Sequence, residues 1–349
     1  MATLLKRRLA DSAFRQLRRG LRHRRGALLV VVAGLALVAC GKGSPSALDP
    51  QGSATKSIAS VAWLMFGLAT AVYVVVGGFI IIGALRGRRA GGEKPSRISD
   101  GAFIWVGGLI APTVILALLA VVTVKTTDSL ATPDPNPVKI EVTGYQFWWA
   151  VRYPDDEVTT ANEVRVPAGR PVEIGLRTRD VIHSFWVPQL AGKVDLVPGQ
   201  RNVIRFTAKN PGEYRGQCAE FCGIQHAKMA FLVVAEEPAE YERWLARQKR
   251  PRAGPSSEQA ARGEVVFMRH ACAGCHAIRG TEARGTRGPD LSDFGSRRTL
   301  GAVAAPNTRA NLAGWILNSQ TIKPGNLMPP VQLESDELLD LIVYLESQR

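Results

Sequence analysis

Residues 216–229 read GQCAEFCGIQHAKM, and from Cys218 to Met229 they place two thiols, an imidazole and a thioether within twelve residues. A second imidazole, His183, stands upstream in the run DVIHSFW. Thiolate, imidazole and a weak thioether together favour copper in an electron-transfer site, whereas hard cations take oxygen ligands. If the sulfurs of Cys218 and Cys222 bridge a pair of coppers, His183 and His226 supply one further strong ligand to each metal. Met229 and a backbone carbonyl then remain as weak axial ligands.

Two simpler interpretations of this cluster remain open. Cys218 and Cys222 could form a disulfide in an exported domain. Two cysteines and two histidines also match a structural zinc site, although zinc has no use for Met229. Packing alone does not require such a cluster, so the alternatives to copper are these two.

The pattern Cys-x-Glu-x-Cys-Gly-x-x-His-x-x-Met, with His-Ser-Phe upstream, resembles the binuclear copper (CuA) loop of subunit II of haem–copper cytochrome c oxidases. The resemblance implies that the Glu220 backbone carbonyl also binds copper and that the Glu220 carboxylate points toward a magnesium site shared with the catalytic subunit. The side chains that it implies as copper ligands are those of His183, Cys218, Cys222, His226 and Met229.

The formal net charge of +14 is concentrated near the start of the chain. Residues 1–40 contain nine Lys or Arg against the single acid Asp11, and residues 86–100 contain five against two acids. The part after Val124 is nearly neutral. A nucleic-acid-binding protein needs a basic face on a folded domain, and none is apparent. Nucleic acid is therefore not expected as a partner.

The first 39 residues have the features of an export signal. Residues 1–25 are rich in arginine, and the short apolar run 27–39 leads into Cys40. A basic region followed by a short apolar run is typical of a secretory signal rather than of a membrane span, and the small residue before Cys40 resembles a bacterial lipoprotein cleavage site. We expect cleavage after residue 39, lipidation of Cys40 and an external segment at 40–57. An uncleaved anchor is the alternative.

Two uncharged apolar stretches, residues 58–85 and 103–124, are each long enough to cross a bilayer. The loop between them is rich in Lys and Arg, which marks the cytoplasmic side of a membrane. We therefore expect a transmembrane hairpin over residues 58–124, with the flanking parts of the chain outside. Two buried core helices are the alternative.

Oxidase subunit II has the same two-span hairpin. Some members of the family carry a glutamate that feeds a proton channel, three residues before the tryptophan that opens the second span. Here the tryptophan is Trp105 and that position is Ala102. Asp100 is the nearest acid, and our hypothesis is that it serves proton entry.

The pattern changes to strands after residues 125–137, a linker stiffened by the prolines of TPDPNP. Short strands separated by Pro and Gly turns indicate an all-β sandwich. The resemblance implies a cupredoxin domain over residues 138–250, closed by an amphipathic helix at 238–249. The expected strands begin at Val138, Val164, Val172, Val203 and Met229.

Within this domain, residues 144–149 read GYQFWW. In the family the corresponding aromatic segment lies over the copper site, and its first tryptophan is the usual entry point for electrons from soluble cytochrome c. Phe147 stands at that position here, followed by Trp148 and Trp149. The resemblance thus implies these three as electron-path aromatics, with a donor other than a soluble cytochrome. Ordinary packing at a strand edge is the alternative.

A second redox module follows a linker at 251–257. Residues 272–276 read CAGCH, the attachment motif of a c-type haem: Cys272 and Cys275 bond to the haem vinyl groups and His276 becomes the proximal iron ligand. Met328, on a proline-flanked loop, is the expected sixth ligand, as in small class I cytochromes c. Met268 is the rival thioether, but it lies too near the motif in sequence to reach the opposite haem face.

Helices are expected from Glu258 to the haem motif and over residues 334–347. A disulfide oxidoreductase is the alternative interpretation of CAGCH, but such enzymes carry a βαβ pattern that is not apparent here. Residues 258–349 therefore predict an all-α class I cytochrome c domain.

The predicted fold class is multidomain: a transmembrane hairpin, an all-β cupredoxin domain and an all-α cytochrome c domain. Over nearly its whole length the chain resembles subunit II of caa-type cytochrome c oxidases, in which a cytochrome c is fused to the copper subunit. The resemblance implies a haem-copper oxidase subunit of the respiratory chain, bound to a bacterial cell membrane with both redox domains outside. Its implied cofactors are two coppers, a haem c and an interface magnesium.

The implied partners are oxidase subunits I and III, with a quinol–cytochrome c reductase or a cytochrome as electron donor. Oxygen reduction would take place in subunit I, so no residue of this chain is expected to be catalytic. Three alternatives use the same cofactors in part: a copper-containing nitric oxide reductase subunit, a membrane-tethered electron shuttle and a metal-delivery protein.

Overall fold

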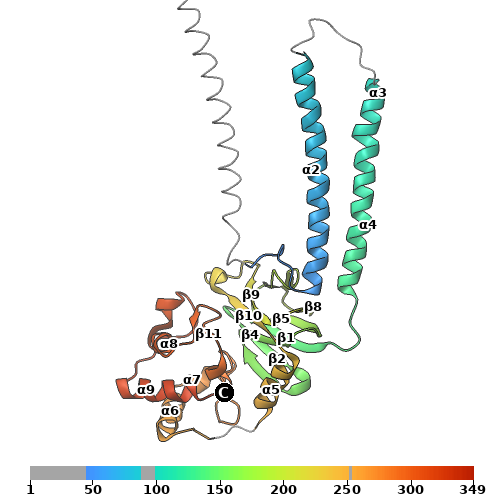
Figure 1. Ribbon diagram of the computed structural model, residues 1–349. Helices are drawn as coiled ribbons and strands as arrows, with labels where there is room; N and C mark the ends of the chain where they lie inside the picture. The colour runs from blue at the N-terminus through green and yellow to red at the C-terminus, as the bar shows by residue number, and fades with distance from the viewer. Residues whose placement is uncertain (1–44, 88–98, 251–253) are drawn as a thin grey trace, which may run out of the picture. The chain divides into compact units, whose positions relative to one another are not determined.

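The computed structural model describes residues 45–87, 99–250 and 254–349 (Figure 1). The predicted leader, Cys40 and most of the loop between the two apolar spans lie outside these residues. In chain order, the described part contains two long apolar helices, a region of short strands and a helical region that includes the CAGCH motif.

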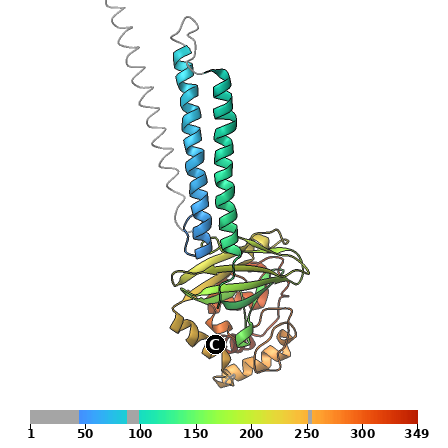
Figure 2. The same cartoon turned by 90° about the vertical axis from the view of Figure 1, so that its right-hand side faces the viewer.

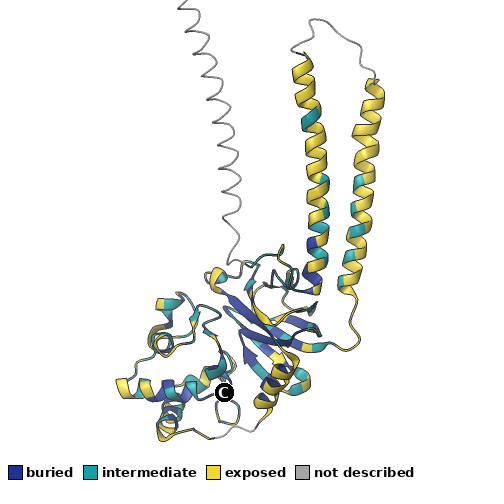
Figure 3. Ribbon diagram, viewed as in Figure 1, coloured by how far each residue is buried: buried dark blue, intermediate teal, exposed yellow. Residues whose placement is uncertain are grey.

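The two apolar helices run alongside each other (Figures 1 and 2). Helix α2 spans Ser53–Gly87, and the second stretch joins α3 (Asp100–Phe103), the π-helix η1 (Ile104–Ile110) and α4 (Ala111–Ala131). Both stretches are candidate membrane spans with a mean hydropathy of 2.4, and their apolar windows are not buried (Figure 3). They are therefore not the core helices of a soluble fold.

Helix α2 begins five residues before the predicted span at Ile58, because its first turn packs against the strand region. The Thr55 hydroxyl donates to the Pro188 carbonyl at 3.2 Å, and the Thr55 N–H donates to the Leu190 carbonyl at 3.2 Å. Ala54 is buried beside them. A search for apolar stretches does not detect this first turn of α2, because the turn packs against the strand region and is less apolar than the rest of the helix.

Ten strands of the described chain form two five-stranded sheets, a sandwich as predicted. In the first sheet the order is β3 (Val158–Ala161), β2 (Trp148–Tyr153), β1 (Val138–Tyr145), β5 (Pro171–Thr178) and β8 (Asn202–Thr207). In the second it is β4 (Glu163–Pro167), β10 (Ala230–Glu236), β9 (Gly212–Cys218), β6 (His183–Trp186) and β7 (Val194–Leu196).

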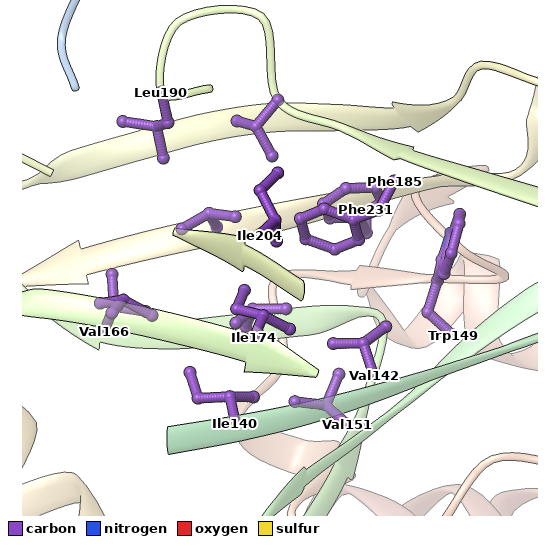
Figure 4. Packing of buried hydrophobic residues seen from close by; sticks show 14 of the residues in the cluster. Ile140, Val142, Trp149, Val151, Val166, Ile174, Phe185, Leu190, Ile204 and Phe231 are labelled. Atoms are coloured by element: carbon purple, nitrogen blue, oxygen red, sulfur yellow. The ribbon is translucent and has the colours of Figure 1, made fainter. Parts of the chain in front are cut away.

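The apolar side chains of the two sheets meet in one core (Figure 4). Alternation along the strands explains this, because successive side chains point to opposite faces of a sheet. Ile140 and Val142 of β1, like Val151 of β2, face inward and are buried. Phe185 of β6 stacks on Phe231 of β10 with ring centroids 4.2 Å apart, which fixes the end of the core nearest the cysteine-rich loop.

The expected strands beginning near residues 138, 164, 172, 203 and 229 are all present, and helix α5 covers Pro238–Lys249 as predicted. The strands at 164 and 172 belong to different sheets, so the chain crosses between sheets at the turn around Gly169. Five strands of the sandwich were not predicted, namely β2, β3, β6, β7 and β9. In β9, glycines and alternating polar residues weaken the strand pattern.

Gly216 is a position where only glycine fits the sandwich. It faces Phe231 across the β9–β10 pair, and a Cβ atom there would lie 2.2 Å from the Phe231 ring. We expect Gly216→Ala to destabilise the protein by about 1–3 kcal/mol, the usual cost of overpacking a core. Denaturant unfolding measures this, with Gly254→Ala as the control, since a Cβ at Gly254 meets open space. Equal stability of the two variants would contradict the proposed packing.

The C-terminal region is helical, as predicted. It contains α6 (Glu258–Arg269), the single turn α7 (Cys272–Cys275), α8 (Arg309–Ile322) and α9 (Ser335–Glu346), with a two-stranded ribbon of β11 (Thr299–Leu300) and β12 (Ala305–Pro306). Ser257 caps α6 by accepting from the Ala260 N–H, and Glu334 opens α9 with a capping box. Since no βαβ unit occurs in residues 254–349, the oxidoreductase alternative is wrong.

Candidate metal centre and haem site

Three neighbouring strands gather the cysteine-rich loop at one end of the second sheet. Strand β6 begins at His183, β9 ends at Cys218, and the two strands pair at Phe185 and Cys218. Strand β10 then begins directly after Met229. The loop that joins β9 to β10 therefore returns His226 and Met229 to the same end as His183 and Cys218.

The donor atoms of this loop lie within a few ångströms of one another. The Cys218 and Cys222 sulfurs are 3.8 Å apart, and His183 Nδ1 lies 3.9 Å from the Cys218 sulfur. His226 Nδ1 and Met229 Sδ each lie 3.8 Å from the Cys222 sulfur. All five side chains that were implied as ligands are thus brought together, on both sides of a pair of sulfurs.

Burial and mutual contact set the protonation of the two thiols. A hydrogen bond from Cys222 lowers the pKa of Cys218 well below its usual value, against the opposing effect of burial. The same hydrogen bond, together with burial, raises the pKa of Cys222. Burial tends to lower the pKa of His183, but its contacts with Cys218 and Asp180 outweigh burial and raise it. The site therefore holds one thiolate readily and favours a cation that would let both sulfurs ionise.

The donor set fits copper better than the alternatives. The sulfur separation of 3.8 Å is well beyond the roughly 2.05 Å of a disulfide, and both cysteines are free. Met229 is fully buried with its sulfur turned to Cys222, an arrangement that a four-coordinate zinc site would not use. Two thiolates, two imidazoles and a thioether match a thiolate-bridged copper site.

The backbone carbonyl and the side-chain carboxylate of Glu220 lie in different surroundings. Its carbonyl oxygen lies 3.2 Å from the Cys218 sulfur, inside the cluster. Its carboxylate is partly exposed and lies 3.7 Å from the Lys193 ammonium. The carbonyl is thus placed among the donor atoms, whereas the carboxylate points away from them toward the surface.

Asp180 orients the His183 ring, a role that the sequence analysis missed. The His183 Nε2–H donates to Asp180 Oδ1 at 2.7 Å, which leaves Nδ1 facing the thiols. Carboxylates behind a metal-binding histidine fix its ring and tautomer. The DVIHSFW run contains this aspartate, so a search for an acid near His183 could have found it.

We expect Asp180→Asn to weaken copper binding roughly 10–100-fold, the usual effect of losing such a partner. The reason is that asparagine keeps an oxygen acceptor but loses the charge that holds His183. Competition between the full-length chain and a copper chelator measures the affinity. Asp155→Asn changes an exposed aspartate outside the site and serves as the control. Affinities that match for both variants would rule out the orienting role of Asp180.

The end of the haem motif borders a cavity of about 530 Å³. Cys275, His276 and Met328 line it. Cys272 stands three residues before Cys275 on the turn α7, but it packs against the core of this domain and is not part of the cavity lining. Met268, the rival thioether, packs against the domain core and is not part of the cavity lining.

The His276 ring is prepared to bind a metal through Nε2. Its Nδ1–H donates to the Pro289 carbonyl at 2.8 Å, and burial lowers its pKa. Gly288 lies against the ring, where a Cβ would come within 2.6 Å of Cε1. Met328 lines the same cavity, and its backbone is fixed by hydrogen bonds with Ser319 and Asn326. The cavity, its apolar lining and these two side chains fit a haem held by a histidine and a methionine.

The sandwich domain completes the lining of this cavity. Residues 145–148, at the turn between β1 and β2, line it together with Arg179 and Asp180. The same turn touches the cysteine-rich loop, residues 218–229, which is called the copper loop below for the metal it is proposed to bind. The Gln146 side-chain amide donates to the Cys222 carbonyl at 2.6 Å. One turn of chain therefore lies against both candidate cofactor sites.

The three candidate electron-path aromatics are divided between two environments. Phe147 and Trp148 line the cavity, and Trp148 stacks on Tyr145 with centroids 4.5 Å apart. Trp149 faces the sandwich core, where its ring lies 5.9 Å from the His183 ring. Trp149 is therefore fully buried beside a candidate ligand and does not line the cavity.

Comparisons with known proteins agree with this arrangement. The family model "Cytochrome C oxidase subunit II, periplasmic domain" matches residues 156–236, and the model "Cytochrome c" matches residues 260–349. Cytochrome c oxidase subunit 2 of Alkalihalophilus pseudofirmus is 36% identical over 323 residues, which cover 90% of this chain and 94% of that protein. Cytochrome c oxidase subunit 2 of Bacillus subtilis is 29% identical over 352 residues, covering 93% and 98%.

Among solved structures, the periplasmic domain of subunit II of cytochrome oxidase from Bradyrhizobium japonicum is 30% identical to this chain. It matches with a TM-score of 0.32 and covers 33% of this chain and 96% of that one. The long, nearly full-length match to the Alkalihalophilus protein, together with the two family models, establishes the family. This chain belongs to the cytochrome c oxidase subunit 2 family and carries a cytochrome c domain at its C-terminal end.

Proposed function

We propose that this chain carries electrons into a haem–copper oxidase, from an external donor to its own haem c, then to a binuclear CuA centre and on to subunit I. When bound, the haem and the copper pair each take up and release single electrons. The observation that carries the proposal is the turn at residues 145–148, which lines the haem cavity and holds the copper loop.

In this proposal the residues of the chain bind and orient the two cofactors. Cys272 and Cys275 attach the haem covalently, and His276 and Met328 bind its iron. His183, Cys218, Cys222, His226, Met229 and the Glu220 carbonyl bind the copper pair. The candidate copper ligands lie at or near the ends of the three paired strands β6, β9 and β10. The ligands therefore move little when the charge of the metal changes, which favours rapid electron transfer.

The fused cytochrome domain takes the place of a docking partner. A short linker gives the tethered domain an effective concentration of about millimolar, so a soluble cytochrome is not needed for delivery to copper. Phe147, at the position of the usual entry tryptophan, lines the haem cavity instead of an open docking face. Of the three candidate electron-path aromatics, Phe147 and Trp148 line the cavity proposed for the haem, and Trp149 packs beside His183.

The partners follow from the same scheme. Subunit I would receive the electrons and reduce oxygen, with subunit III in the same complex. The donor would be a quinol–cytochrome c reductase or another cytochrome. We place both redox domains on the extracytoplasmic side of a bacterial membrane, with the Glu220 carboxylate facing an interface magnesium.

A purification tests which complex contains the chain. The chain is tagged, extracted from its own membranes in mild detergent and isolated. We expect a large haem-bearing subunit to accompany it and the complex to consume oxygen with a reduced cytochrome or a quinol-driven donor. Consumption of nitric oxide instead would favour the reductase alternative. A chain that purifies alone, with both cofactors bound, would contradict the oxidase assignment and favour a tethered shuttle.

A further inference from the structure

Lys323 is a buried cation that the proposed electron path does not yet use. Its side chain is 2% exposed, and no described carboxylate forms an ion pair with it. The ammonium instead donates to two carbonyl oxygens, that of Phe147 at 2.8 Å and that of Gly301 at 3.0 Å. Leaving a charge in such a place is costly unless its surroundings favour it, so a reason for its burial is needed.

The position of Lys323 links the two redox domains. It ends helix α8 in the cytochrome domain, and it lines the haem cavity. Phe147, to which it donates, belongs to the sandwich domain and lines the same cavity. Burial lowers the pKa of Lys323 to about 7, while the charge of Cys222 acts in the opposite direction. Phe147 directly follows Gln146, whose side-chain amide donates to the Cys222 carbonyl at 2.6 Å, so the ammonium is bonded to the neighbour of a residue that contacts the cysteine-rich loop.

The residues on either side of Lys323 are bound by the copper loop. The Lys228 ammonium donates to the Ile322 carbonyl at 3.1 Å, and the Gln225 amide donates to the Pro324 carbonyl. Three successive residues of the cytochrome domain, Ile322 to Pro324, are thus hydrogen-bonded to the sandwich domain. Of these three contacts, only that of Lys323 is buried and places a charge between the two sites.

Residues 322–324, which are hydrogen-bonded to the sandwich domain, lead directly into the loop that carries Met328, the proposed axial ligand of the haem iron. Gly325 N–H donates to the Gln320 side chain at 2.7 Å, and Asn326 contacts both Ser319 and the Lys323 carbonyl. Met328 follows two residues later and is held by the same groups. A displacement of Lys323 would therefore change the loop that carries Met328 as well as the contact with Phe147.

We propose that Lys323 is a positioning residue for electron transfer: its ammonium holds the turn before Met328 against the Phe147 carbonyl, and its charge favours the reduced copper pair beside Cys222. This inference rests on the proposed function, since it assumes that both cofactors are bound and exchange electrons. A positive charge stabilises the state of a metal centre that has gained an electron. Loss of the charge should therefore lower the copper potential and with it the driving force from the haem.

Three variants of the full-length chain separate the positioning effect of the Lys323 side chain from the effect of its charge on the copper potential. Lys323→Met removes the charge and the donor, Lys323→Gln keeps a neutral donor, and Lys323→Arg keeps the charge. Lys139→Met changes an exposed lysine of strand β1 and is the control. Each variant is examined by hydrogen exchange without metal, by optical redox titration with both cofactors, and by the rate of transfer from haem to copper.

For Lys323→Met we expect faster amide exchange in residues 144–149 and 322–328, a lower copper potential and slower transfer. A tenfold shift of the electron equilibrium toward the haem corresponds to about 59 mV for one electron. Lys323→Gln should lower the copper potential with a smaller effect on exchange, and Lys323→Arg should restore the potential. The control should match the original chain.

The outcomes distinguish this inference from the proposed function. If the original chain itself transfers no electron from haem to copper, the proposed function fails. If it does so and Lys323→Met matches it in exchange, potential and rate, only the role of Lys323 fails. Should Lys323→Met not fold, Lys323→Gln with an unchanged copper potential is enough to overturn the electrostatic part.

Discussion

Cys218→Ser and Cys222→Ser are each expected to abolish the binuclear copper centre. Each sulfur lies 3.8 to 3.9 Å from a histidine nitrogen and 3.8 Å from the other sulfur, so both are needed to bridge two metals. A serine hydroxyl is a harder and far less acidic donor, which does not replace a thiolate for copper. Copper bound per chain should fall from two ions to at most one, and the visible bands of a thiolate-bridged pair should disappear.

The measurement combines metal analysis with visible and electron paramagnetic resonance spectra of the full-length chain. Ser184→Ala is the matched control, because the Ser184 hydroxyl is buried next to His183 and has no hydrogen-bond partner among the described residues. The control should bind copper normally. A cysteine variant that kept two coppers and the spectrum of the pair would show that the sulfurs do not bridge them.

Met328→Leu is expected to remove the sixth ligand of the haem iron. Loss of a thioether that raises the haem potential should lower this potential by tenths of a volt, a substantial part of the roughly 0.8 V that axial ligands span. The absorption of a methionine-ligated ferric haem should disappear as well. Transfer of electrons from the haem to copper would become slower, or would require a donor of lower potential.

Met268→Leu is the matched control, because it changes the other methionine near the haem motif. Met268 packs against the core of the cytochrome domain and is not part of the cavity lining, so its replacement should leave the potential unchanged. Optical redox titration and absorption spectra of both variants decide between the two thioethers. The opposite pattern, with Met268 controlling the potential, would assign the ligand to helix α6.

Many candidate ligands of the two sites could be recognised from the sequence because they are grouped in short segments. Five of the six candidate copper-binding residues lie within residues 218–229, and CAGCH contains both thiols and the histidine of the haem motif. Helix α5 could be placed at its observed bounds because Pro238 and a helical spacing of apolar residues mark it. The two candidate membrane spans were recognisable from length and composition, although their helices extend beyond the apolar stretches.

What the sequence did not predict depends on contacts between distant residues. Lys323 and Phe147 are 176 positions apart, and nothing in the local pattern of either indicates that they meet. Helix α8 was missed because its apolar residues do not form a clear stripe and Asn318 interrupts its backbone. Trp149 could be recognised as an aromatic residue of interest, but only its burial between His183 and Phe231 separates it from Phe147 and Trp148.

The contact between the two redox domains extends beyond Lys323. The Thr160 hydroxyl lies 3.0 Å from both oxygens of Asp293, and Glu163 accepts from the Arg298 N–H at 2.7 Å. Burial raises the pKa of Glu163 despite this hydrogen bond. The Thr160 hydroxyl and the Glu163 Oε1 atom thus bond to groups of the cytochrome domain, and these buried contacts stabilise one arrangement of the two domains.

The central claim is that one chain delivers electrons from its own haem to its own copper pair, and rapid mixing tests it most directly. The full-length chain, loaded with both cofactors in detergent, is mixed with a small reductant while the haem and copper bands are followed. We predict reduction of the haem, then its reoxidation as copper is reduced, at a rate that does not change with protein concentration. A transfer rate proportional to protein concentration, or reduction of copper ahead of the haem, would contradict the account.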